Sequence, residues 1–358
     1  MPDPPAFAPT TIVTHPSLDR LLADVGAPVR RVVFARGVEA VRDTNGGWQQ
    51  PPAFPGAAPP AVAALAALGL RPVEPPPGGA PGGSLGGAAP PSHDPVAVSA
   101  RHGLAPLLLV TSGALGTETT HLVSTAGALG WRPAIDRLYD DATLARHALR
   151  LRFVLDALEH HAARAAESYV ACAASARRTA ALFGTGELTT LAGQTALFVE
   201  LDALLRAVQR SYIGAARLLA AGFAPRRGPH ARAHPTAHDA DLRRTPFDAL
   251  VLGARGAPVE LRETLLAAWE TNGARTGAYR RALRAHDVAE LGHAPVQLAR
   301  LEADVWAVSV AVALGAGPQR GRGATALPRR QDALDRAWEL ATDAARVVSL
   351  VVFALSDD

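Results

Sequence analysis

LARHALRLRFVLDALEHHAARAAESYVACAASA, residues 144–176, is the stretch of sequence that decides the fold. Apolar residues recur in it at alternating steps of four and three, at Leu144, Ala148, Leu151, Leu155, Leu158, Ala162, Ala165, Tyr169, Cys172 and Ala176. This spacing places them on one face of a helix. The stretch therefore predicts one long helix packed along a neighbour, with Cys172 as a buried structural thiol.

A second stripe follows the glycine-containing turn LFGTGELTT at 182–190. Its members are Leu197, Leu201, Leu204, Val208, Tyr212, Ala215 and Leu219. Because the connection is short, the two long helices are predicted to be antiparallel neighbours.

Further apolar stripes predict the rest of the bundle. Shorter helices are expected around Trp269, at 279–291 and at about 295–312, and a last helix carries Leu334, Trp338, Ala341, Ala345, Val348 and Val352. The third of the shorter helices rests on Leu298, Leu301, Val305 and Val308. The predicted fold class is mainly α: an antiparallel helical bundle of five or six helices over residues 131–358, with two long core helices.

The chain before the bundle has a different composition. Residues 1–44 predict a small segment, either disordered or strand-helix-strand, with TIVTH (11–15) and VRRVVFA (29–35) as strands. Residues 45–104 are rich in Pro, Gly and Ala and are expected to be a disordered linker. Residues 105–130 form a poorly defined connection that contains the strand-like PLLLVT (106–111), and 224–246 is expected to be a mobile loop inside the bundle.

Composition excludes several classes of function. All 36 basic residues are Arg, so a Schiff-base lysine and a phosphate-loop lysine are ruled out. Cys172 is the single cysteine, which excludes an intramolecular disulfide and a cysteine zinc cluster. No signal-peptide pattern and no long apolar run occur, so we expect a cytoplasmic protein without a membrane partner. The net charge of +3 does not by itself indicate nucleic acid, and nothing points to DNA.

One stretch carries residues suited to catalysis: AYRRALRAHDV, at 278–288. Arg280 and Arg281 precede His286 by six and five positions, directly after Tyr279. A histidine that titrates near neutrality can take the proton of a ribose 2′-hydroxyl or supply one to the leaving oxygen. A neighbouring Arg can stabilise charge that develops on the phosphorus oxygens. The alternative is that these residues form a solvated basic helix turn.

An Arg followed after four to six residues by His, near the start of a helix late in an all-helical bundle, resembles the motif of the HEPN family. The resemblance covers about Asp136 to Ser356. It implies an RNA-directed protein, a metal-independent endoribonuclease acting as a homodimer without a cofactor. His286 would be the general acid and base, Arg281 or Arg280 the charge stabiliser, and Tyr279 a supporting residue. The alternative is a non-catalytic helical interaction or dimerisation module, because Ala282 follows Arg281 where the family commonly has a polar residue.

Two carboxylates on the second long helix, Glu200 and Asp202, lie about 200° apart around the helix and cannot face one site. Glu200 adjoins the apolar stripe, so we expect it to support the site by pairing with a bundle arginine such as Arg281, or to be exposed.

Two other patterns are weaker. His230, His234 and His238 recur at four-residue steps, but the prolines around them argue against a helix, so no metal site is predicted. TSGALGTETT, at 111–120, follows a strand-like run with hydroxyl residues that a phosphate loop could use.

Overall fold

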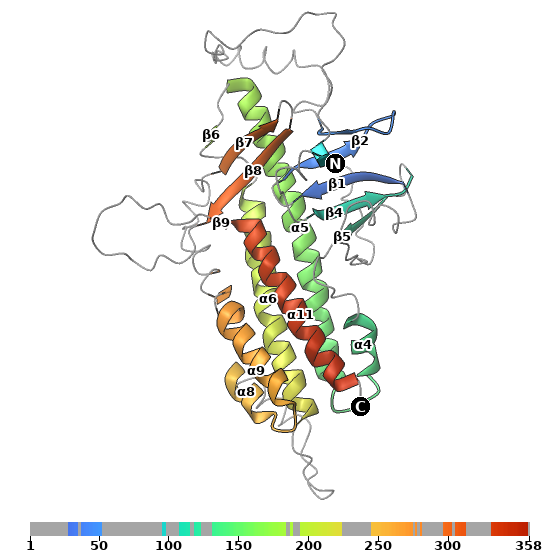
Figure 1. Ribbon diagram of the computed structural model, residues 1–358, viewed down its shortest axis with the longest axis vertical. Helices are drawn as coiled ribbons and strands as arrows, with labels where there is room; N and C mark the ends of the chain where they lie inside the picture. The colour runs from blue at the N-terminus through green and yellow to red at the C-terminus, as the bar shows by residue number, and fades with distance from the viewer. Residues whose placement is uncertain are drawn as a thin grey trace, which may run out of the picture.

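The computed structural model is dominated by helices that pack lengthwise against one another (Figure 1). The residues it describes are 28–34, 37–51, 95–97, 107–114, 118–122, 131–183, 187–188, 194–223, 245–274, 276–277, 280, 296–302, 305–312 and 331–356.

Three long helices form the body of the bundle: α5 (Ala145–Phe183), α6 (Gln194–Gly222) and α11 (Ala333–Ser356). They lie side by side in Figure 1. The members of the α5 stripe from Leu144 to Cys172 are buried, as are all members of the α6 and α11 stripes named above. The mainly α fold with two long core helices is thus confirmed, because an apolar residue at every third or fourth position finds a helix to pack against.

Shorter helices close one end of the bundle. They are α4 (Trp131–Arg137), α8 (Phe247–Gly253) and α9 (Val259–Ala268), and α9 continues directly into the π-helix η2 (Trp269–Gly273). The Trp269 ring stacks on Phe247 with ring centroids 4.4 Å apart and meets Tyr212 of α6 edge to face. These aromatic contacts tie α8 and η2 to α6.

The region predicted as a helix at 295–312 is instead a β-hairpin, so that prediction is wrong. Strands β7 (Val296–Glu302) and β8 (Val305–Val312) pair antiparallel, flanked by β6 (Glu187–Leu188) and β9 (Gln331–Asp332) in the order β6-β7-β8-β9. Valine occupies 305, 308, 310 and 312 in β8. β-Branched side chains lose rotamer freedom in a helix and pack well on a pleated sheet, which favours the hairpin.

A second antiparallel sheet lies beside α5 (Figure 1). Its strands are β1 (Val29–Phe34), β2 (Glu39–Arg42), β3 (Trp48–Gln49), β4 (Leu107–Ser112) and β5 (Thr119–Leu122), in the order β3-β2-β1-β4-β5. The strands expected at 29–35 and 106–111 are confirmed as β1 and β4.

This sheet also changes the boundaries expected for the N-terminal part. β3 lies beyond residue 44, and β4 and β5 place part of 105–130 in the sheet rather than in a connecting segment. The strand expected at 11–15, most of the predicted linker and residues 224–244 of the predicted loop lie outside the described residues.

Arg31 fastens the sheet to the bundle. Its guanidinium donates to both carboxylate oxygens of Glu167 on α5, at 2.7 and 2.8 Å, and to Glu39 of β2 at 2.6 Å. Burial disfavours the charged guanidinium, but the two carboxylates outweigh it and raise the pKa of Arg31. Val33 of β1 and Leu109 of β4 belong to the same apolar core as the helices, so sheet and bundle share one interior.

Candidate functional site

Arg280 is the one member of the predicted catalytic turn within the described residues. Its guanidinium donates to both carboxylate oxygens of Asp202 on α6, from Nε at 3.0 Å and from Nη2 at 3.3 Å. The arginine side chain is 15% exposed and the carboxylate 25% exposed. Arg280 is therefore joined to α6 through Asp202. Tyr279, Arg281 and His286 lie outside the described residues.

Glu200 faces a different direction from Asp202, as the helical geometry predicts. Its Oε2 lies 2.9 Å from Nδ1 of His161, and its Oε1 lies 3.9 Å from Nε of Arg164. Both partners come from α5, so Glu200 joins the two long helices. Glu200 thus pairs with a bundle arginine, Arg164, while Arg281 lies outside the described residues and the pair expected with it stays a prediction.

A groove that could hold a ligand lies between α5 and α6. It has a volume of about 930 Å³. Its walls are formed by Tyr139, His147, Leu149, Arg150, Leu151, Arg152, Phe153, Val154, Asp156, Arg210, Ile213, Gly214 and Arg217. We call it the basic groove.

Gly214 brings the two helices close together at the floor of the basic groove. A Cβ atom placed at this position would lie 2.9 Å from Cδ1 of Leu151. Leu151 is buried beneath the groove, whereas Leu149 and Phe153 on the same helix point outward. The floor is therefore apolar and is shaped by backbone proximity rather than by a mobile loop.

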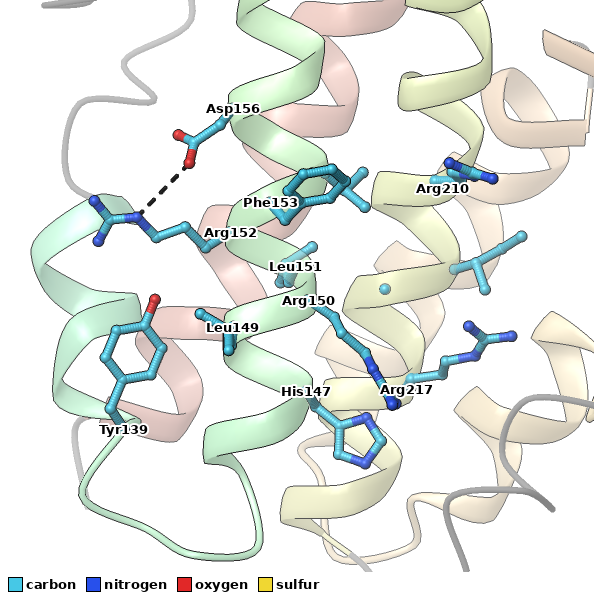
Figure 2. Close-up of a pocket in the computed structure, with 13 residues that line it drawn as sticks. Tyr139, His147, Leu149, Arg150, Leu151, Arg152, Phe153, Asp156, Arg210 and Arg217 are labelled. Carbon is cyan, nitrogen blue, oxygen red and sulfur yellow. Dashed lines mark ion pairs between the residues drawn. The ribbon is translucent and has the colours of Figure 1, made fainter. Parts of the chain in front are cut away.

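The rim of the basic groove is cationic. Figure 2 shows His147 and Arg150 of α5 and Arg217 of α6 at one end, and Arg210 nearer the other end with Phe153. The single carboxylate among the lining residues is that of Asp156.

That carboxylate is already committed to an arginine. Asp156 lies 3.9 Å from Nε of Arg152, and Arg152 also donates to Asp136. The hydrogen bond to Asp136 raises the pKa of Arg152. Arg150, Arg210 and Arg217 also line the groove, so its lining contains more cations than carboxylates.

Two apolar side chains stand in this cationic rim. Leu149 is 62% exposed and Phe153 is 69% exposed, one helical turn apart on α5. An exposed aromatic is uncommon in a chain whose residues are only 5% aromatic. Exposed apolar side chains that line a groove are available for contact with a ligand.

The basic groove is connected to the predicted catalytic turn along α6. Asp202, Arg206 and Arg210 follow one another at four-residue steps, so they share one stripe of the helix. Arg206 and Arg210 are exposed. Because Asp202 binds Arg280, this stripe leads from the groove to the beginning of the predicted catalytic turn.

A polar cluster on the other side of α6 is structural. Asp343 of α11 accepts hydrogen bonds from the Tyr212 hydroxyl, from Nδ2 of Asn272 at 2.9 Å and from Nη2 of Arg346 at 2.7 Å. Burial opposes ionisation of Asp343, but these three donors outweigh it and lower the pKa of Asp343. Burial, followed by the hydrogen bond to Asp343, raises the pKa of Tyr212. The donors and acceptors satisfy one another, so this cluster joins α6, η2 and α11.

The phosphate-loop interpretation of 111–120 is wrong. β4 turns back into the antiparallel strand β5 rather than leading into a helix. The hydroxyls of Thr111 and Thr120 bond to each other across the two strands at 3.0 Å. A phosphate loop needs the backbone amides at the beginning of a helix, which this hairpin does not supply.

Two searches over the described part of the chain were negative. It contains no group of three metal-ligating side chains, and none of its helices combines the length and apolar character needed to cross a membrane. The loop with His230, His234 and His238 lies outside the described residues. Cys172 is buried as expected, and burial raises the pKa of its thiol to about 11.

Sequence reasoning alone did not find the basic groove. The available signal was Leu149 and Phe153, two large apolar residues four positions apart that fall off the core stripe of α5. Arg146 and Arg150 flank them on the same polar face. The register between α5 and α6 decides which residues of α6 complete the groove. That register cannot be derived from the sequence alone.

Comparison with known proteins leaves the site to be interpreted from its own geometry. No protein-family model, no curated protein and no solved structure matches this chain.

Proposed function

We propose that this protein is an RNA-directed helical protein that binds single-stranded RNA in the basic groove. The observation that carries the proposal is the groove itself, in which Arg150, Arg210 and Arg217 surround an apolar floor with an exposed phenylalanine. Arginines that track a phosphate backbone beside an aromatic side chain are the usual elements of a single-strand binding surface.

The arrangement of the arginines supports contact with more than one phosphate. Arg210 and Arg217 lie seven positions apart on α6, which is about 10 Å along the helix axis. Arg150 approaches from α5 on the opposite wall. Guanidinium groups bind phosphate oxygens with planar, paired donors and stay charged at every physiological pH.

The same charge pattern argues against a second copy of the chain as the occupant. A two-fold symmetric contact through the basic groove would place its arginines against the same arginines of the partner. Like charges brought together and desolvated are costly, and Asp156 is already bound by Arg152. A homodimer is therefore expected to use another surface.

RNA rather than DNA is proposed because of the turn that follows Arg280. His286 and Arg281 suit transfer of the 2′-hydroxyl proton and charge stabilisation at phosphorus, and the 2′-hydroxyl is absent from DNA. Because Arg280 is paired with Asp202, charge stabilisation is assigned to Arg281. The reaction is cleavage without a metal, in the manner of the HEPN family.

Binding is tested by fluorescence anisotropy with a 12-nucleotide unpaired RNA between 50 and 200 mM KCl. Three phosphate contacts predict that log K falls against log salt with a slope of about −2, and each of Arg150→Gln, Arg210→Gln and Arg217→Gln should reduce that slope by about 0.7. The matched control is Arg255→Gln, which removes the same charge from an exposed position between α8 and α9 and should leave the slope unchanged.

Three results would overturn RNA binding in the basic groove. They are a control variant that weakens binding as much as Arg210→Gln, tighter binding of a DNA strand of the same sequence, and equal binding of polyglutamate of matched charge. The last result would mean that the surface recognises an acidic protein segment rather than a nucleic acid.

Cleavage is tested separately, by incubating the protein and His286→Ala with RNA in EDTA. The proposal expects products from the protein and none from the variant, with equal RNA affinity for both. Equal cleavage by the two, or cleavage by neither, removes the ribonuclease reaction and leaves binding as the function.

A further inference from the structure

Phe153 occupies a position that packing among the described residues does not explain. Its side chain is 69% exposed although it belongs to a helix whose opposite face is fully buried. In Figure 2 the ring stands on the outer side of α5 within the basic groove, with Arg210 on the neighbouring helix. A ring exposed to this extent in a groove lined by arginines can be reached by a flat ligand.

We infer that Phe153 is a stacking platform for one unpaired base, and that through it the basic groove selects single-stranded over duplex RNA. This inference rests on the proposed function and deepens it, because it names the class of RNA and the residue that selects it. Arg150 and Arg210 hold the phosphates on either side, and Phe153 receives the base between them.

The selection follows from where the faces of bases are available. In a duplex each base is stacked on its neighbours, so its face cannot lie on a protein side chain without the helix being opened. In a single strand the base can turn away from its neighbours and stack on an aromatic ring. Such stacking tolerates any sequence, because every base has a flat face. The apolar neighbour Leu149, 62% exposed, lies one helical turn away and extends the surface under the base.

The phosphate contacts do not make this distinction. Guanidinium groups bind the backbone of either form, so the arginines supply affinity and salt dependence without a preference for unpaired RNA. The preference for unpaired RNA therefore depends on Phe153, and the salt dependence of binding depends on the arginines. Variants of the two kinds of residue can separate these properties.

The test uses the full chain and three RNA probes: a 12-nucleotide unpaired strand, a hairpin with the same number of phosphates whose loop nucleotides are abasic, and the unpaired strand with abasic sites. The variants are Phe153→Ala and Phe153→Trp. The matched control is Phe353→Ala, which shortens a phenylalanine of α11 that is 43% exposed and lies outside the groove lining. Because Phe153 is exposed, Phe153→Ala should unfold at the same urea concentration as the parent protein.

Loss of one stacked base should weaken binding of the unpaired strand between about 5-fold and 150-fold in Phe153→Ala. Affinity for the hairpin and for the abasic strand should be unchanged in Phe153→Ala, and Phe153→Trp should retain or improve affinity for the unpaired strand. Phe353→Ala should resemble the parent protein with all three probes.

Two failures can be told apart. If the arginine variants lower the salt slope but Phe153→Ala binds the unpaired strand like Phe353→Ala, or loses affinity equally for all three probes, the stacking inference is overturned and RNA binding stands. If no probe binds, or the arginine variants match Arg255→Gln, the proposed function falls and the inference falls with it.

Discussion

Replacing Tyr212 by Phe removes one hydroxyl from the centre of the bundle and nothing else. Tyr212 is fully buried, and its hydroxyl donates to Asp343, an acceptor that also receives Asn272 and Arg346. A hydrogen bond to a charged acceptor contributes about 1.5–3 kcal/mol, so Tyr212→Phe should lower the free energy of unfolding by about that amount at pH 7. The ring and its contact with Trp269 are retained.

The stability difference between the parent protein and Tyr212→Phe should also depend on pH above about pH 10. The pKa of Tyr212 is raised in the folded protein, whereas an unfolded tyrosine ionises near pH 10. The unfolded state therefore loses this proton first, and the stability that the neutral hydroxyl provides below pH 10 is lost as the pH rises toward the folded pKa. At pH 11 the loss is about 1.4 kcal/mol in the parent protein and is absent from Tyr212→Phe.

Urea unfolding followed by circular dichroism at pH 7, 9 and 11 measures both quantities. The difference in unfolding free energy between parent and variant should be constant from pH 7 to 9 and should shrink by about 1.4 kcal/mol at pH 11. A difference below about 0.5 kcal/mol at pH 7, or one that does not change at pH 11, would refute the assignment of Tyr212 as a buried donor to Asp343.

Three further outcomes are expected from the fold. Because burial raises the thiol pKa of Cys172 to about 11, the native protein at pH 8 should react with a disulfide reagent at least about 100-fold more slowly than the urea-unfolded chain; comparable rates would contradict its burial. Gly37→Ala should lower unfolding stability by about 1–3 kcal/mol, since Gly37 has a φ of 68° and an added Cβ would lie 2.9 Å from that of Ala173; an unchanged urea midpoint would show that the backbone relaxes freely there. Glu167→Gln replaces one of the two carboxylate oxygens that accept from Arg31 by a donor NH2 and removes the charge, so it should speed amide exchange in β1 about 5- to 50-fold; exchange in α6 serves as the internal reference and should not change.

The long helices were predictable because their signal is local and repeated. The stripe from Leu144 to Cys172 satisfies the helical period over eight turns, and no alternative period fits that many apolar residues. The 296–312 hairpin was missed because four apolar positions matched a helical step by coincidence. The valines of β8 carried the contrary signal, which is the β-branched preference for a pleated surface.

The candidate site was predictable only in part. The opposite orientation of Glu200 and Asp202 follows from two residues and the pitch of a helix, and the structure agrees. The ion pair between Arg280 and Asp202 could not be predicted from the sequence, since the two residues lie 78 positions apart. An ion pair of this kind depends on which helices become neighbours.

What the sequence by itself determined is the set of helix faces: which residues of α5, α6 and α11 are apolar, and hence that these helices pack. Such periodicity is a property of each segment alone. The tertiary structure decided which exposed faces of these helices lie next to each other once the buried faces have packed. Gly214 meets Leu151 and places Arg210 and Arg217 across from Arg150 and Phe153, because close packing of the buried stripes sets one register between the helices. The basic groove is a consequence of that register, and so is the function proposed for it.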